Sequence, residues 1–132
     1  MTLVDSSAWI EFLRSTGSPA NVRVRELLAA RDIAICDAVR MEVLAGARDE
    51  SALRHIYSTL ERATIIPTLP TDYDDAATLY HRCRCQGETV RKLIDCLIAA
   101  VAIRIGIALL HNDRDFDVLA RYTELQIDRP ES

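Results

Sequence analysis

The stretch from Ile105 to Leu119 reads "IGIALLHNDRDFDVL" and joins an apolar run to a polar turn and a second apolar pattern. The short apolar run that starts after Gly106 is bounded by polar residues, which is typical of a buried strand. From Asp113 onward the apolar residues recur at helical spacing, with carboxylates in the first turn. The stretch therefore predicts a strand, a turn and a helix, which is the repeating unit of a parallel α/β sheet.

The same alternation runs along the whole chain. It predicts strands at "TLVD", "IAIC" and "IALLH", a brief extended piece at 64–70 and an edge strand at 125–127. Helical spacing and caps predict helices over 6–15, 18–32, 37–46, 49–63, 71–87, 91–106 and 113–122. Short apolar strands that alternate with helices indicate an α/β fold. We expect one domain over residues 1–132, a three-layer α/β/α arrangement with a central parallel sheet.

Composition excludes several protein classes. The apolar fraction is 49%, which is typical of a globular protein, and the length of 132 residues fits one domain. Asp5 interrupts the first apolar stretch before a signal-peptide core could form, and the longest apolar run is far shorter than the ~20 residues of a membrane span. The four cysteines show no C-x-x-C spacing. We therefore expect reduced thiols, no membrane association and a cytoplasmic protein.

The net charge of −4 argues weakly against nucleic-acid binding. If five of the 20 acidic residues met in one pocket, the remaining 15 would be offset by the 16 basic residues. Fifteen of those basic residues are Arg, whose planar fork suits phosphate, although arginine-rich codon usage explains the same bias.

Most acidic residues at helix starts need no functional explanation, because they complement the exposed N–H groups and the helix dipole. This structural role accounts for Asp72, Asp74 and Asp75, for Asp37 as a helix cap, and for Asp117.

Asp5 and Asp113 fit that role less well. Each ends an apolar strand and begins a strand-to-helix turn. In open parallel sheets, ligands bind outside the carboxyl ends of the strands. We therefore expect these two carboxylates to form part of a site.

Asp95 lies on a helix that is apolar almost all round, which indicates burial against the sheet. A buried carboxylate is costly unless it is paired or bound to a metal. An Arg91–Asp95 pair across one helical turn is the structural alternative. Glu42 is a weaker candidate of the same kind, since it lies among the apolar residues of "RMEVLAG".

Four carboxylates brought together would repel strongly, by ~4 kcal/mol for each pair about 4 Å apart at an effective dielectric near 20. Oxygen ligands with no lysine nearby favour a hard divalent cation, Mg²⁺ or Mn²⁺. If Asp5, Glu42, Asp95 and Asp113 met in the fold, such a cation would relieve their repulsion.

Four segments, "LVDSSAWIEFL", "MEVLAG", "LIDCLIAAVAI" and "LLHNDRDFDVL", resemble in order and spacing the motifs of PIN-domain ribonucleases. The similarity is greatest to the VapC-like toxins of bacterial toxin–antitoxin pairs. It covers nearly the whole chain, and its specificity comes from four motifs in order rather than from any one of them.

This resemblance implies an endoribonuclease that uses Mg²⁺ or Mn²⁺. It implies catalytic roles for Asp5, Glu42, Asp95 and Asp113 and an extra metal position at Asp115, for which a role in the helix first turn is an equal explanation. Ser7 matches the small hydroxyl residue found beside the first aspartate, and we expect Ser7 and Arg114 to contact the substrate. The implied products carry 5′-phosphate and 3′-hydroxyl ends.

The resemblance also implies partners: an RNA substrate such as the loops of tRNA, a VapB-like antitoxin, and a second copy of the chain in a homodimer. Two other functions stay open at this point. An aspartyl-phosphate phosphotransfer domain also places acids at strand ends. Such a domain needs a lysine near its last strand or a D-x-D pattern after its first strand, but here Lys92 lies before a helix and Asp5 is followed two residues on by Ser7. A non-catalytic module could instead receive an Arg-rich partner segment in an acidic pocket.

Overall fold

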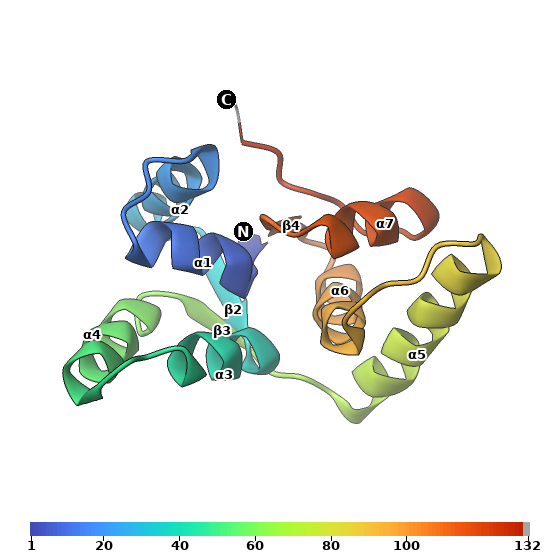
Figure 1. Cartoon of the computed structure of the whole chain (residues 1–132), viewed down its shortest axis with the longest axis horizontal. Coiled ribbons are helices and arrows are strands. Elements are labelled where there is room, and N and C mark those ends of the chain that lie inside the picture. The colour runs from blue at the N-terminus through green and yellow to red at the C-terminus, as the bar shows by residue number, and fades with distance from the viewer. Residues whose placement is uncertain (131–132) are drawn as a thin grey trace.

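The computed structural model describes residues 1–130, which form one four-stranded sheet and seven helices (Figure 1). The strand order is β3-β2-β1-β4, and each neighbouring pair is parallel. The strands are β1 (Thr2–Val4), β2 (Ile33–Cys36), β3 (Thr64–Ile66) and β4 (Ala108–Leu110).

Helices flank this sheet, with α1 to α4 to one side of the strands in Figure 1 and α5 to α7 to the other. The predicted three-layer α/β/α fold with a central parallel sheet is confirmed. The helices are α1 (Ser6–Leu13), α2 (Pro19–Ala30), α3 (Asp37–Ala45), α4 (Glu50–Leu60), α5 (Pro70–Cys85), α6 (Leu93–Ile105) and α7 (Arg114–Tyr122).

Two extended segments differ from the sequence-based expectation. The piece at 64–70 contributes a true edge strand, β3, whose Ile65 pairs with Ile35 of β2. The expected edge strand at 125–127 is only a single bridge, in which Ile127 lies beside Leu109. Pro67 ends β3 soon after it begins, which explains why the apolar pattern there was too short to identify as a strand.

Two helix starts also need correction. Cys36, not Asp37, is the N-cap of α3, and the Asp37 carboxylate accepts a hydrogen bond from the Thr68 backbone N–H at 2.9 Å instead. Helix α6 begins at Leu93 rather than at Arg91. Lys92 is its N-cap residue, so residues 91 and 92 belong to the connection from α5 and not to the helix face that carries Asp95.

The structural role expected for Asp72 is confirmed. Its carboxylate is fully buried, accepts the Leu69 backbone N–H at 2.8 Å and pairs with the Arg104 guanidinium at 2.8 Å. Burial raises the pKa of Asp72, and the hydrogen bonds from Arg104 and Leu69 outweigh it, so that the pKa is lowered overall. This pair ties the start of α5 to the end of α6.

The parallel register places the ends of β1 and β4 side by side. Val4 pairs with Leu110, and the Asp5 backbone N–H donates to the Leu110 carbonyl at 2.9 Å. The turns that follow these two strands therefore meet at the carboxyl edge of the sheet, as the sequence predicts for Asp5 and Asp113.

Two composition-based expectations, reduced thiols and the absence of a membrane span, can be compared with the structure. Cys36, Cys83, Cys85 and Cys96 are all free thiols. Within the described residues, no helix combines the length and the apolar character that crossing a bilayer requires.

Candidate metal centre

Asp5 follows β1 directly and is the N-cap of α1. Its Oδ2 accepts the Ser7 backbone N–H at 3.0 Å and the Ser7 hydroxyl at 2.6 Å. The same hydroxyl accepts the Asn112 backbone N–H at 2.8 Å, so Ser7 ties the turn after β1 to the turn after β4. Ser7 thus holds one oxygen of Asp5, while Oδ1 is buried without a hydrogen-bond partner in the described chain.

Glu42 comes from α3 and lies beside the first turn of α1. Its Oε1 accepts the Ser6 hydroxyl at 3.1 Å. Burial and the neighbouring charge of Asp5 raise the pKa of Glu42. The two carboxylates are therefore close enough to interact, although they come from helices far apart in the sequence.

Asp95 lies in the first turn of α6 and is 1% exposed. Its Oδ2 is buried with no hydrogen-bond partner among residues 1–130. Burial, a hydrogen bond with Asp115 and the charge of Asp5 raise the pKa of Asp95 to about 8. A buried carboxyl group with a raised pKa and an oxygen that lacks a hydrogen-bond partner would be stabilised in its charged form by a nearby cation.

Asp113 and Asp115 stand at the start of α7, and both contact the two residues before α6. The Arg91 guanidinium spans both carboxylates, with Nη2 2.8 Å from Asp113 Oδ1 and Nε 3.0 Å from Asp115 Oδ1. The Lys92 ammonium lies 2.8 Å from Asp113 Oδ2 and 3.6 Å from Asp95 Oδ2. Burial raises the pKa of Asp113, and the hydrogen bonds and charges around it, Lys92 foremost, lower it overall.

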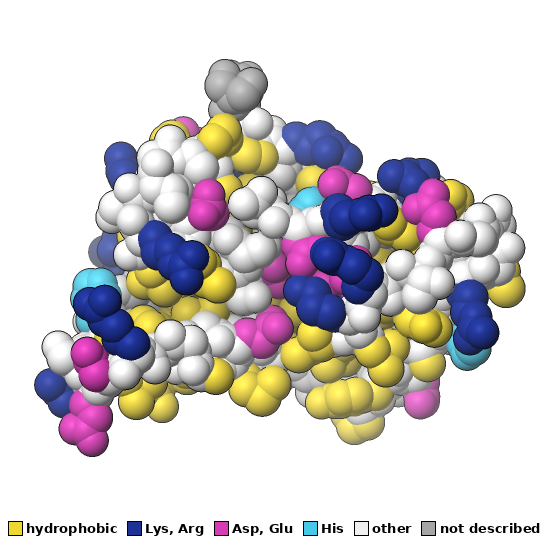
Figure 2. Space-filling model, in the orientation of Figure 1, with side chains coloured by type: hydrophobic (Ala, Val, Ile, Leu, Met, Phe, Trp, Pro, Cys, Tyr) yellow, Lys and Arg dark blue, Asp and Glu magenta, His cyan; other side chains and the backbone are white. Residues whose placement is uncertain are grey.

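These contacts correct two expectations. The Arg91–Asp95 pair is wrong: in the described part of the chain the ion pairs of Arg91 are with Asp113 and Asp115. The expectation that no lysine lies near the acids is also wrong, because Lys92 is placed among them (Figure 2 shows acidic side chains bordered by basic ones on this face). The signal was available in the sequence, since the single lysine of the chain lies three residues before Asp95.

Three carboxylates meet closely enough to share one ion. Ligand oxygens of Asp95, Asp113 and Asp115 all lie within 4.8 Å of one another. Asp5 is not in this group, but its charge acts on both Asp95 and Lys92. This group offers carboxylate oxygens, among which Asp95 Oδ2 is buried without a hydrogen-bond partner in the described chain, as is Asp5 Oδ1 outside the group. Oxygen ligands of this kind fit a divalent cation.

Arg114 and Asp117 lie outside the three-carboxylate group. Arg114 is the first residue of α7, is exposed, and lines two shallow clefts beside Asp113 and Asp117. Asp117 lies on the outer side of α7, 3.5 Å from His111 Nε2 and 3.7 Å from Arg129. It is 43% exposed and takes no part in the three-carboxylate group.

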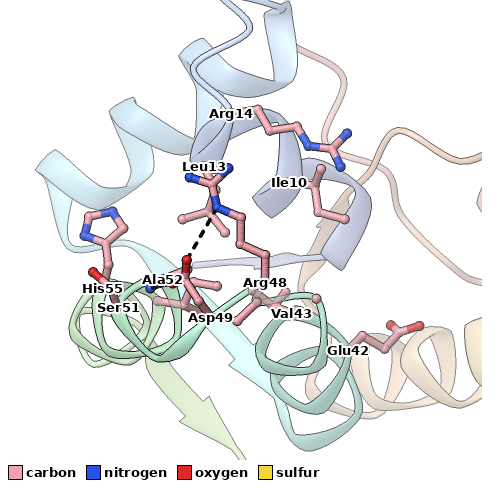
Figure 3. A pocket seen from close by; sticks show the side chains of 13 residues that line it. Ile10, Leu13, Arg14, Glu42, Val43, Arg48, Asp49, Ser51, Ala52 and His55 are labelled. Carbon is pink, nitrogen blue, oxygen red and sulfur yellow. Dashed lines mark hydrogen bonds and ion pairs between the residues drawn. The ribbon is translucent and has the colours of Figure 1, made fainter.

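A groove of about 720 Å³ lies between α1, α3 and α4 (Figure 3). Ile10, Leu13 and Val43 give it an apolar floor, and Arg14 and Arg48 stand at its rim. Glu42 lines the groove as well, so one of the candidate site residues borders it. The sequence contains no pattern that marks this groove, because its lining comes from three helices with no shared motif.

The raised pKa of Asp95 predicts a change of stability with pH in metal-free protein. At a pH between the ordinary value of 3.8 and about 8, folded Asp95 keeps a proton that the unfolded chain releases. Wild-type stability should therefore fall as the pH rises through this window, by at most roughly 1.4 kcal/mol per pH unit for one proton. Asp95→Asn carries no such proton. Its free energy of unfolding should therefore rise relative to that of the wild type as the pH approaches 8. Urea unfolding in EDTA across this range measures the difference; two curves that stay parallel would show that Asp95 is ionised throughout.

Comparison with known proteins adds independent information. A family model described as the PIN domain matches residues 2–122. The chain is 47% identical to ribonuclease VapC11 of Mycobacterium tuberculosis and to VapC ribonuclease Mb1587 of Mycobacterium bovis, in each case over 96% of both chains.

Solved structures give the same fold at low sequence identity. VapBC2 from Rickettsia felis, bound to a promoter DNA fragment, aligns with a TM-score of 0.75 and 19% identity over 98% of both chains. FitAcB from Neisseria gonorrhoeae aligns with a TM-score of 0.77 and 17% identity, again over 98% of both chains.

Proposed function

Since this chain belongs to the PIN-domain family, and within it to the VapC ribonucleases, we propose that it is a metal-dependent endoribonuclease, the toxin of a toxin–antitoxin pair. The observation that carries the proposal is the meeting of Asp95, Asp113 and Asp115 at the sheet edge where Asp5 also lies. The chain as a whole, residues 1–132, is proposed to act as one nuclease domain.

We propose that Asp5, Asp95 and Asp113 hold the ion, which is Mg²⁺ or Mn²⁺. Such an ion supplies a Lewis acid for the scissile phosphate and lowers the pKa of a bound water. Asp5 Oδ1 and Asp95 Oδ2 support this assignment, because both are buried without a hydrogen-bond partner among the described residues. Asp115 takes an outer position, since its carboxylate already accepts hydrogen bonds from Arg91 and Lys92.

The other residues orient the reactants. Glu42 has a pKa raised by burial and lies beside Asp5, so it is placed to accept a proton from the attacking water or to orient that water. The water oxygen forms a bond to phosphorus, the bond from phosphorus to the 3′ oxygen breaks, and that oxygen takes up a proton. The products are then a 5′-phosphate and a 3′-hydroxyl. Ser7 fixes Asp5, and the exposed Arg114 contacts the RNA.

We propose the following partners from the relatives: structured RNA such as tRNA as substrate, a VapB-like antitoxin, and a second copy of the chain. The cytoplasm is the compartment in which these partners meet. The relatives' ribonuclease names favour RNA cleavage over both the aspartyl-phosphate domain and the non-catalytic binding module.

The test is cleavage of RNA by purified protein freed of any partner. Incubation of total RNA with Mg²⁺ or with Mn²⁺ should give discrete fragments with 5′-phosphate ends, and EDTA should abolish them. Equal cleavage in EDTA would contradict the metal mechanism, and absence of cleavage with either ion would favour the binding module.

A further inference from the structure

We propose that Lys92 binds the scissile phosphate of the RNA and that Asp115 positions it for this task. The inference rests on the proposed ribonuclease function and adds to it a cation supplied by the protein. Its evidence is the way in which the two residues before α6 are fixed against the acidic carboxylates.

Asp115 holds the backbone of the segment that carries Lys92. Its carboxylate accepts the Arg91 backbone N–H at 3.2 Å and the Lys92 backbone N–H at 3.1 Å, and it accepts Arg91 Nε at 3.0 Å. The side chain is 2% exposed and also shares a hydrogen bond with Asp95. A carboxylate with this many protein donors has little capacity left for direct contact with an ion, in agreement with its outer position, and its hydrogen bonds fix the Arg91–Lys92 peptide.

The two basic side chains of this segment differ in how firmly their contacts hold them. Arg91 is held by two carboxylates at once through its planar guanidinium, in a fork that fixes its orientation. Lys92 makes one short contact, 2.8 Å to Asp113 Oδ2, and its side chain is 50% exposed. Its ammonium is a compact charge on a flexible stem, so it can turn from Asp113 to a ligand that arrives from solvent.

The position of the ammonium selects the ligand. Lys92 Nζ lies against Asp113 and 3.6 Å from Asp95, the two carboxylates proposed to hold the metal. A phosphodiester bound beside these carboxylates would bring its non-bridging oxygens near the Lys92 ammonium. Negative charge on these oxygens grows as the water attacks, and a fixed positive charge beside them is favourable at that moment. Lys92 keeps its proton and forms no bond to the RNA.

This role predicts two opposite effects of removing the charge. Lys92 and a divalent cation compete for Asp113, so Lys92→Met should bind Mn²⁺ more tightly than the wild type, roughly fivefold or more. The same variant should cleave RNA more slowly even at saturating metal, by on the order of 100-fold, as when a single oxyanion donor is removed. Lys92→Arg keeps the charge and should recover part of the lost rate.

The experiment measures Mn²⁺ affinity by titration without RNA, and then single-turnover cleavage of a labelled RNA at saturating Mn²⁺. Arg62→Met is the matched control: it removes one exposed positive charge between α4 and β3, at the opposite edge of the sheet, and should change neither quantity. Unchanged or faster cleavage by Lys92→Met at saturating metal would overturn the inference, since Lys92 would then only neutralise the carboxylates. Weaker Mn²⁺ binding by Lys92→Met would contradict the competition between Lys92 and the cation for Asp113. A wild-type protein that cleaves no RNA would contradict the proposed function itself.

The positioning role of Asp115 has its own readout. Asp115→Asn should slow RNA cleavage in the wild-type background. In the Lys92→Met background it should cause little further loss of rate, because Asp115 acts through Lys92. Independent, multiplicative losses in the two backgrounds would show that Asp115 acts on the metal instead.

Discussion

Asp113→Asn is expected to reduce single-turnover RNA cleavage by on the order of 1,000-fold, or about 4 kcal/mol of activation free energy. Asp113 contributes to the three-carboxylate group and is also the partner of Lys92 and Arg91. Its replacement removes a negative oxygen from the proposed metal position and frees both basic side chains. The measurement is the cleavage rate across a Mg²⁺ titration, which separates a loss of metal affinity from a loss of rate at saturation.

Asp117→Asn is the matched control from the same "NDRDFD" stretch. Asp117 lies outside the carboxylate group and is partly exposed beside His111 and Arg129. Its replacement should leave cleavage intact and cost at most ~1 kcal/mol of stability, the usual range for a charge in a helix first turn. If Asp117→Asn proved as damaging as Asp113→Asn, the assignment of this turn would be wrong.

Divalent metal is expected to stabilise the folded protein strongly. An ion that binds only the folded state, at 100 times its dissociation constant, adds ~2.7 kcal/mol to the free energy of unfolding. For a domain of this size, that gain corresponds to a rise of roughly 10 °C in Tm. Asp95→Asn should abolish the rise, because Asp95 is buried and its Oδ2 lacks a hydrogen-bond partner among the described residues.

Thermal unfolding with EDTA, Mg²⁺ and Mn²⁺ measures this effect, with Asp117→Asn as the control that should keep the full shift. An equal metal-induced shift in Asp95→Asn and the wild type would place the stabilising ion elsewhere on the protein.

The fold could be predicted because the pattern that marks each of its main strands lies within a few neighbouring residues. Strands β1, β2 and β4 are each a short apolar run that ends in a polar turn, and this pattern located them and the turns after them. Edge strand β3 was harder, since Thr64 and Ile65 are exposed and carry no burial pattern. The expected strand at 125–127 has alternating residues but pairs at only one position.

The candidate carboxylates were predictable for a related reason. Acids that follow apolar strands, or lie within an apolar helix, are anomalous in the sequence itself, and these are Asp5, Asp95 and Asp113. Their counter-charges were predictable only in part: the sequence shows Lys92 three residues before Asp95, but not which carboxylates Arg91 and Lys92 contact. Arg91 and Lys92 were assigned to a helix that begins only at Leu93, so their side chains were placed on the wrong element.

The Ser6–Glu42 and Ser7–Asn112 contacts could not be predicted either, because each joins segments that only the folded sheet brings together. Local pattern thus identifies which groups are unusual. Their partners depend on the long-range register of β1 against β4 and on the path of the segment before α6.

The central claim is that the carboxylates at this sheet edge hold the divalent cation that the cleavage requires. Anomalous diffraction from crystals grown with Mn²⁺, at a concentration that supports cleavage, tests it most directly. The account predicts a manganese peak in contact with carboxylate oxygens of Asp5, Asp95 and Asp113. A manganese ion bound elsewhere, with none at these three residues, would contradict it.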